Sequence, residues 1–174
     1  MRFLFVSPLY YPHIGGVENV VKSVAERLVA LGHEVVVLAG EPSANAPFGE
    51  VIGGVRVVRW PTWAPGFAYH VPRLRESLKR WLRQAVADLD VVHVHTVHSI
   101  FSVWTGLRIL RLGFRGRVVL SAHYHGGGHT AFRNALWIVW RRYVERLLRE
   151  STVHVASSHE AKLLEQDFGV ESVV

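Results

Sequence analysis

The sequence predicts an α/β fold: a mostly parallel sheet with helices on both faces. Short, continuous apolar runs alternate along the chain with longer segments whose apolar residues recur at helical spacing. Nearly every position in each short run is apolar, which is typical of a strand buried on both faces of a parallel sheet. No repeat, low-complexity tract or linker interrupts this alternation, so we expect a single domain over residues 1–174.

The opening residues predict a strand–helix–strand unit. We expect a strand over residues 2–6 and a loop over residues 7–16. A helical apolar pattern begins at Val17, and Gly32 is placed to end that helix. A second strand over residues 34–39 completes the unit and puts the loop at the carboxyl end of the first strand.

Gly15 and Gly16 lie in that loop, directly before the helix. Ligands of open α/β sheets bind at the carboxyl ends of the strands. A helix start offers free backbone N–H groups and partial positive charge, which suit a phosphate. The segment reads Gly-Gly-Val-Glu rather than G-x-G-x-x-G, and two prolines precede it, so a plain NAD site is disfavoured.

The rest of the chain continues the alternation. Further strands are expected over residues 55–60, 90–95, 117–121 and 152–156. Further helices are expected from about residue 73 to 89 and over residues 100–112, 131–149 and 158–169. Irregular loops are expected over residues 41–48 and 62–71, and the beginning of one more strand over residues 170–174. Pro61 should stop the strand that precedes it.

In a parallel sheet, the loops that follow the strands gather at one edge. Four such loops carry polar residues or glycines: residues 12–18, 95–99, 123–129 and 157–160. We expect them to converge on a single rim, and this convergence is the main functional signal in the sequence.

Bulk properties limit the class of protein. A chain of 174 residues forms one sizeable core, and its apolar runs fall short of the roughly 20 residues that cross a bilayer. No separate leader precedes the first strand, and cysteine is absent, so we expect a cytoplasmic protein without disulfides or thiolate metal sites. Few Asn, Gln and Met residues, with arginine exceeding lysine, suggest a thermophilic source.

The formal net charge of +6 favours phosphate-rich partners such as an anionic membrane or a nucleotide-bearing ligand. A solvated basic surface is the alternative. We expect no nucleic-acid partner, because no known binding module is present. The basic side of the helix after Pro72, with Arg75, Lys79 and Arg80 near Trp81, fits either a membrane surface or a half-buried surface helix. The helix over residues 131–149 combines aromatic and basic residues and leaves the same choice between core packing and contact with a lipid-linked acceptor.

Six of the eleven histidines fall between His93 and His129. Imidazole is a common metal ligand, but the residues around these histidines include no carboxylates, so we expect no metal site. His93 is explained as a satisfied polar residue of its strand. His123 ends a strand ahead of three consecutive glycines that permit close backbone approach to a ligand, so we expect it to bind.

Two acidic patterns have simpler explanations. Asp88 and Asp90 form a D-x-D pattern, but they precede their strand and lie at the wrong edge of the sheet, in a helix-to-strand turn. Glu26 is expected to pair with a neighbour on its helix. Glu18, in the first helical turn beside Gly16, could accept a hydrogen bond from a ligand hydroxyl or simply complement the helix dipole.

Several segments, in this order, resemble the N-terminal domain of the retaining family 4 glycosyltransferases, which have the GT-B fold with two Rossmann-like domains. They are FLFVSPLYYPHIGGVENVV, GHEVVVLA, DVVHVHT, VVLSAHYH and VHVASSHEAKLLE. The resemblance covers the whole chain. It implies that the chain is the domain that holds the acceptor, and that the domain that binds the nucleotide sugar is absent from these residues.

The resemblance also implies roles for matching residues. Gly15 and Gly16 would bring backbone N–H groups to the diphosphate of the donor, and His123 would lie beside the transferred sugar or the acceptor. Glu18 would help to seat the acceptor, whose wall would be formed by His95, Ser99, Gly126 and Gly127. Transfer would proceed by front-face attack, with the departing phosphate taking the acceptor proton and no cofactor required.

Glu18 and Glu26 only imitate the Glu-x7-Glu motif of the donor-binding domain, so the isolated chain is expected to be inactive. The acceptor would be a sugar, a lipid-linked hydroxyl or another hydroxyl compound, with possible contact to the inner face of the membrane. Three alternatives remain: a binding subunit that pairs with a separate donor-binding chain, half of a sugar-nucleotide epimerase, and a dehydrogenase. A neighbouring gene for the donor-binding half, product analysis and a test of nicotinamide-cofactor binding would separate them.

Overall fold

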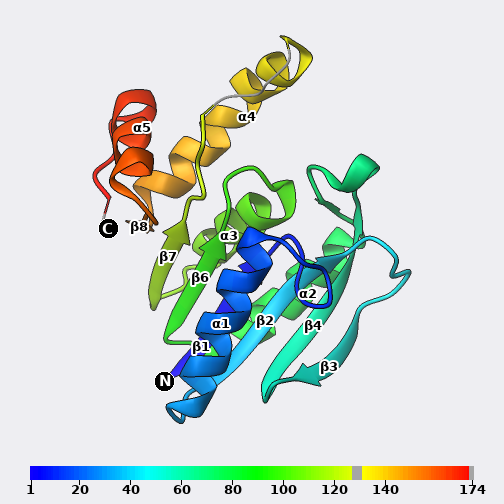
Figure 1. Ribbon diagram of the computed structural model, residues 1–174. Coiled ribbons are helices and arrows are strands. Elements are labelled where there is room, and N and C mark those ends of the chain that lie inside the picture. Colours follow the sequence, from blue (N-terminus) through cyan, green and yellow to red (C-terminus); the bar gives the residue numbers. More distant parts are fainter. Residues whose placement is uncertain (127–130, 173–174) are drawn as a thin grey trace.

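The computed structural model describes residues 1–126 and 131–172, with the backbone alone for residues 131–136. A mostly parallel sheet lies at the centre, as the sequence predicted, and strands and helices alternate except between β2 and β5, which are joined without an α-helix (Figure 1). The strands are β1 Arg2–Ser7, β2 Glu34–Glu41, β3 Phe48–Ile52, β4 Val55–Trp63, β5 Val71–Pro72, β6 Val91–His95, β7 Arg117–Ser121 and β8 Thr152–His154. The helices are α1 Gly16–Ala30, α2 Arg75–Ala85, α3 Ile100–Arg111, α4 Ala131–Arg149 and α5 Ser158–Phe168, with short 3-10 turns η1 Pro65–Phe67 and η2 Val86–Asp88.

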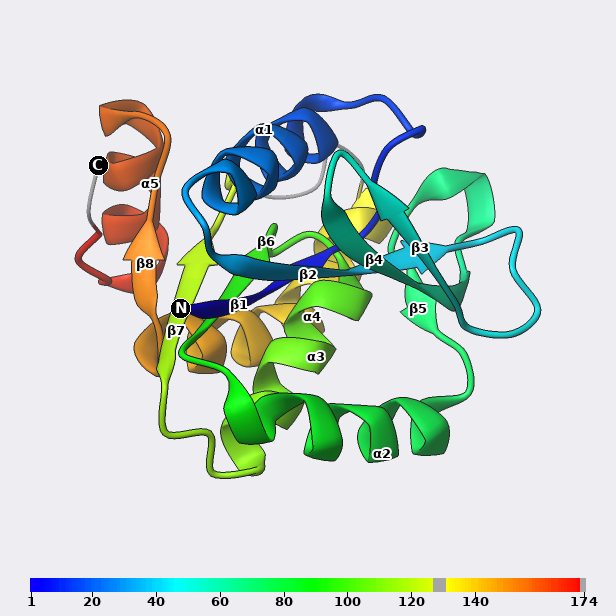
Figure 2. The ribbon, with the colours of Figure 1, turned by 90° about the horizontal axis from the view of Figure 1, so that it is seen from below.

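The sheet has the order β3-β4-β2-β1-β6-β7-β8, with β5 beside β4. β1, β2, β4, β6, β7 and β8 pair in parallel, whereas β3 and β5 pair with β4 in antiparallel fashion. One helix, α1, covers one face of the sheet, and α2, α3 and α4 cover the other (Figure 2). All the parallel strands therefore end at the same edge.

Two apolar clusters hold the layers together. The larger one lies on the side of α2, α3 and α4 and includes the buried residues Leu4, Leu82 and Phe101. The smaller one lies under α1, where Val21 and Ala25 meet residues such as Phe5. The continuous apolar strands thus face a core on both sides, as the sequence pattern predicted.

The structure corrects the prediction in the segment before β4. β3 was missed because four of its five residues are exposed and it has no apolar run. It forms a hairpin with β4 through Gly53 and Gly54, whose φ angles of 57° and 81° suit the tight turns of hairpins. Pro61 does not stop β4, which continues to Trp63. The pairing with β3 ends at Arg59, so the N–H group that Pro61 lacks is not needed for a hydrogen bond to β3.

Other element ends differ by a few residues. α2 begins at Arg75, because Leu74 takes a left-handed conformation with φ 49°, and the helix gives way to η2 at Val86. Residues 170–172 form no strand, and the final two residues of the strand expected over 170–174 lie outside the described part of the chain.

Candidate functional site

The loops after β1, β6 and β7 lie at one rim of the sheet, as expected for parallel strands (Figure 1). The β1 loop ends at Gly15, which caps α1 in an extended conformation with φ −162°. His123 follows β7 at the same rim, two positions after the last residue of that strand. The paired glycines and His123 are therefore at the same end of the molecule, although they are more than one hundred residues apart in the sequence.

Arg59 fixes the loop that carries the glycines. Its side chain lies almost wholly inside the protein, with 1% of its surface exposed. Nη1 donates a hydrogen bond to the carbonyl of Tyr10 at 3.1 Å, Nη2 donates to the carbonyl of Tyr11, and Nε donates to Glu50 at 2.6 Å. Arg59 lies in the strand expected over residues 55–60, where no role was predicted for it. The same strand carries the exposed Arg56, so the sequence alone gave no sign of which arginine is buried.

A second carboxylate, Glu41, extends this support. Its oxygens accept hydrogen bonds from Ser43 at 2.7 Å and contact His13 at 3.2 Å, and Arg59 lies 3.9 Å away. Burial by itself raises the pKa of Glu41, but the hydrogen bonds from Ser43 and His13 outweigh it and leave the pKa below its ordinary value. The loop over residues 8–15 is thus tied to β4 by Arg59 and to the end of β2 by Glu41.

Glu18 lies over Gly15 at the start of α1. A Cβ atom on Gly15 would come within 2.3 Å of Oε2 of Glu18, whereas a Cβ atom on Gly16 would meet nothing within 4 Å. The space beside Gly16 is open, and the carboxylate of Glu18 sits where the helix dipole favours negative charge. Both functions that the sequence left open for Glu18 are compatible with this position.

A row of histidines crosses the sheet beneath the rim. Nδ1 of His95 lies 3.4 Å from Nε2 of His123, and their rings are stacked with centroids 5.6 Å apart. His93 is hydrogen-bonded to the hydroxyl of Ser121 at 2.8 Å, and that hydroxyl also lies 3.1 Å from Nδ1 of His154. The prediction that His93 is a satisfied strand residue is confirmed.

Three of these histidines, His93, His95 and His123, have lowered pKa values. Burial, together with the neighbouring His154 and His123, lowers the pKa of His93 to about 4. The pKa of His95 lies well below its ordinary value, chiefly because the ring is buried and also because His93 is close. Burial lowers the pKa of His123 as well; Glu160 opposes this shift and His154 adds to it.

Two residues at the same rim have strained backbone conformations. His123 and Thr96 have φ angles of 47° and 66°, although neither is glycine. Residues with side chains rarely take this left-handed conformation, and it clusters at functional sites in proteins. The two residues follow β7 and β6, so the chain turns sharply where these neighbouring strands end.

Glu160 links the rim to α5. Its two carboxylate oxygens accept hydrogen bonds from the backbone N–H groups of Tyr124 at 2.8 Å and Ala156 at 2.9 Å. Ser157 caps α5 by accepting a hydrogen bond from the N–H of Glu160. The loop over residues 157–160 thus lies at the expected edge, where its acid fixes the segment after His123.

Next to these residues lies a groove of about 850 Å³ with mostly apolar walls. Its lining includes Glu18, Thr96 and Ser99 on the rim side and the aromatic residues Trp63, Phe67, Tyr69, Trp137 and Trp140 elsewhere. Ser99 is nearly buried and caps α3 by accepting a hydrogen bond from the N–H of Ser102, so only a small part of it reaches the groove. Volumes of this size are typical of pockets for small molecules.

His95 is fully buried and reaches the rim only through His123. Gly126 has φ 95°, a conformation that favours glycine, and follows His125 at the end of the described β7 loop. Gly127, expected in the acceptor wall, lies outside the described residues. Across residues 1–126 and 131–172, no three His, Cys, Asp or Glu side chains are grouped to hold a metal ion.

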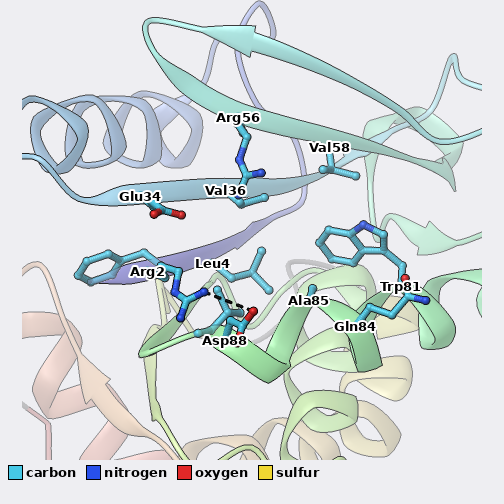
Figure 3. A pocket seen from close by; sticks show the side chains of 12 residues that line it. Arg2, Leu4, Glu34, Val36, Arg56, Val58, Trp81, Gln84, Ala85 and Asp88 are labelled. Atoms are coloured by element: carbon cyan, nitrogen blue, oxygen red, sulfur yellow. Dashed lines mark ion pairs between the residues drawn. The ribbon is translucent and has the colours of Figure 1, made fainter.

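A second cavity, of about 400 Å³, lies at the opposite, amino end of the strands (Figure 3). Asp88 forms an ion pair there with Arg2 at 3.3 Å, and Asp90 accepts a hydrogen bond from the backbone N–H of Arg2 at 2.6 Å. The D-x-D pattern therefore joins α2 to the start of the sheet, away from the rim, as its position in the sequence predicted.

Comparison with known proteins identifies the family of this chain. The family model for Glycosyltransferase Family 4 matches residues 14–174. The chain belongs to this family. The resemblance to the family 4 glycosyltransferases that the sequence motifs indicated is thereby confirmed, and the matched residues include both glycines and His123.

Two relatives of this Family 4 chain are named for lipid glycosylation. The alpha-monoglucosyldiacylglycerol synthase of Acholeplasma laidlawii is 37% identical over 102 residues, which cover 58% of this chain and 25% of that protein. A phosphatidylinositol N-acetylglucosaminyltransferase subunit of Arabidopsis thaliana is 35% identical over 130 residues, 71% of this chain and 27% of that protein. The chain therefore matches about a quarter of the length of each relative.

The fold of the Family 4 chain also matches solved structures. The alpha,alpha-trehalose 6-phosphate synthase of Burkholderia multivorans aligns with a TM-score of 0.55 and 14% identity, over 95% of this chain and 41% of that one. At this identity the match concerns the fold alone. In the described part of the chain, no helix is both long and apolar enough to pass through a membrane.

Proposed function

We propose that this Family 4 chain is the acceptor-binding half of a glycosyltransferase that uses a nucleotide-sugar donor and retains the anomeric configuration. One observation carries the proposal: the start of α1 at Gly15 and Gly16 and the ring of His123 lie at one rim, beside a large apolar groove. The donor-binding half would lie outside residues 1–174, which agrees with the quarter of each relative that the chain matches.

The diphosphate of the donor would bind at the start of α1. The backbone N–H groups there point out of the helix, and the open space beside Gly16 admits a bulky anion. Positive charge at the helix end would stabilise the leaving diphosphate as the bond to the sugar breaks. This interaction requires no metal or other cofactor.

In this mechanism the acceptor hydroxyl attacks from the side on which the diphosphate leaves, and a phosphate oxygen takes the hydroxyl proton. No side chain of this half has to remove a proton, which fits a neutral His123 that hydrogen-bonds to the sugar or the acceptor. Glu18, Ser99 and Gly126 would position the acceptor, together with Gly127. His95 would contribute through His123. Catalysis by this half is therefore mainly a matter of positioning.

The groove favours an acceptor with an apolar part. Trp63 and Phe67 line it and are largely exposed, at 62% and 67%, so an apolar ligand would cover aromatic surface that otherwise meets water. The names of the two relatives also refer to lipids that carry a hydroxyl group. We therefore favour a lipid acceptor whose hydroxyl reaches the rim while its hydrocarbon part lies in the groove.

A lipid acceptor would place the protein at the cytoplasmic face of a membrane. The outward side of α2 carries Arg75, Lys79 and Arg80, while Leu78 and Leu82 are buried against the core. Such a basic surface is attracted to anionic lipid headgroups. We therefore include contact between α2 and the membrane surface in the proposal.

The test is to combine the chain with its donor-binding half and to measure sugar transfer to diacylglycerol in vesicles from a panel of nucleotide sugars. We expect an α-linked glycolipid from an α-linked donor, formed by the combination and not by the 174-residue chain alone. Replacing His123 with Ala should lower kcat/KM by about 100-fold or more, because hydrogen bonds to a reacting sugar are worth several kcal/mol. Released nucleotide without glycolipid, or a β-linked product, would contradict the proposal.

A further inference from the structure

The ring of His95 is held in one orientation by its neighbours. It is completely buried at the end of β6. The rings of Phe5 and His123 stack on it, each with a centroid distance of 5.6 Å, and the ring of His93 lies 4.1 Å away. With an aromatic ring on several sides, His95 has little freedom to rotate. Its two nitrogens therefore occupy fixed, different environments.

Among the described residues, only one of these nitrogens has a polar partner. Nδ1 lies 3.4 Å from Nε2 of His123, whereas Nε2 of His95 is buried and has no hydrogen-bond partner among the described residues. A neutral imidazole carries a single proton, on one nitrogen or the other. Burial and the neighbouring histidines keep His95 neutral, since its pKa is far below 6.5.

The position of this proton follows from the cost of an unpaired donor. With the proton on Nε2, His95 would hold a buried N–H group without an acceptor, and native proteins rarely tolerate this. With the proton on Nδ1, the N–H group points at His123 and only a lone pair remains unpaired. The second arrangement makes the available hydrogen bond and leaves no buried donor without a partner.

We propose that His95 is a positioning residue: its Nδ1–H donates to Nε2 of His123, so that His123 carries its own proton on Nδ1 and presents that N–H group to the ligand. The inference deepens the proposed function, because it rests on His123 as the residue that contacts the sugar or the acceptor. Nδ1 of His123 has no hydrogen-bond partner within the described part of the chain, so a ligand oxygen can accept its proton.

This arrangement sets what the site can recognise. A fixed N–H donor on His123 would favour a hydroxyl or ring oxygen of the sugar and would reject a group that can only donate. Neutrality of His123 is consistent with this, because its pKa is lowered by burial and by His154, against the opposite effect of Glu160. The other histidine of β6, His93, packs against His95 but hydrogen-bonds to Ser121 and not to His123.

The test is nitrogen-15 NMR of the 174-residue chain with labelled histidine, near pH 7.5 and without any ligand. Long-range proton–nitrogen correlations show which ring nitrogen carries the proton. Histidine in water favours the proton on Nε2, so we expect His123 to differ by having it on Nδ1. A wild-type His123 protonated on Nε2 would overturn the proposal, and this measurement needs no variant.

Two variants separate positioning from simple packing. His95→Phe keeps a ring in the stack and removes the donor, so the His123 proton should shift toward Nε2. His95→Asn restores an N–H group near the place of Nδ1 and should return the proton to Nδ1. His93→Phe is the matched control and should leave His123 unchanged. An unchanged His123 in the folded His95→Phe variant would contradict the proposal.

The same variants can be compared in the combined enzyme. His95→Phe should lower kcat/KM roughly tenfold, as expected for one lost hydrogen bond, and His95→Asn should recover part of it. If the proton positions are as expected and no sugar is transferred, the proposed function fails while the inference about His95 stands. If sugar is transferred and His123 carries its proton on Nε2, the inference alone fails.

Discussion

Arg59 carries a positive charge in the protein interior, where its guanidinium group holds the loop after β1 in place. Its guanidinium group is bonded on three sides: to two successive backbone carbonyls, of Tyr10 and Tyr11, and to the carboxylate of Glu50. Only a planar group with several N–H donors can make these bonds at once. Because the loop leads directly to Gly15, a single residue of β4 sets the position of the proposed diphosphate site.

Replacing Arg59 with Met should lower the free energy of unfolding by roughly 2–3 kcal/mol, since two buried carbonyls lose their donors. Glu50 is 38% exposed and can turn to water, so it adds little to the loss. Lys at this position should recover less than half, because it cannot reach all three acceptors. Urea unfolding measures these values.

Arg56→Met on the same strand is the control. Arg56 is exposed and forms no ion pair with any described residue, so its replacement should change the stability by less than about 0.5 kcal/mol. Equal effects of the two substitutions would show that Arg59 does not hold the loop in the way described.

Among the elements, β6, β7 and β8 share a polar row that makes stability depend on pH. An unfolded histidine takes up a proton near pH 6.5, whereas the folded His93 does so only near pH 4. Protons are thus taken up on unfolding between these values, and the folded state loses stability as the pH falls from 7 to 5. For His93 alone the loss is roughly 2 kcal/mol, and the buried His95 adds to it.

Urea unfolding at pH 7 and pH 5 tests this expectation. The His93→Phe variant should show a smaller decrease between the two pH values than the wild type, because one titrating group is gone. His33→Phe serves as the control, because His33 lies outside the row, next to Phe3, and should leave the decrease unchanged. A wild-type stability that does not fall between pH 7 and pH 5 would disprove the linkage.

The elements also show where sequence patterns reach their limit. The central parallel strands were predicted to within a few residues, because burial on both faces forces a continuous apolar run. β3 lies at the edge of the sheet and is mostly exposed. Because exposed positions need not be apolar, its sequence shows no apolar pattern that would predict the strand. The start of α2 depends on the left-handed Leu74, a conformation that residue type does not predict.

At the scale of the whole molecule, topology explains why part of the site was predictable. Parallel strands end at one edge, so the loops after β1 and β7 had to meet there, and Gly15 and His123 with them. Side chains point alternately to the two faces of a strand, so the sequence predicts on which face a residue lies. It does not predict which residue that side chain contacts. The bonds of Arg59 to a loop some fifty residues earlier and of His95 to His123 therefore required the structure.

The distribution of charge gives the last prediction. Reversing Arg75, Lys79 and Arg80 to Glu should weaken binding to anionic vesicles at least tenfold, because each basic residue near such a surface contributes about 1 kcal/mol. We expect a smaller loss of affinity than three free charges would give, because Lys79 already pairs with Glu76 at 2.5 Å. Sedimentation with vesicles, with and without anionic lipid, measures it.

A matched control makes this test specific to α2. Arg27, Arg115 and Arg117 are exposed and lie outside α2, and their reversal to Glu changes the net charge by the same amount. If membrane contact is made through α2, only the first set should weaken binding at least tenfold, and added salt should weaken binding of the wild type by screening. If both sets act equally, the attraction is one of overall charge, and α2 is a half-buried surface helix whose basic side faces only water.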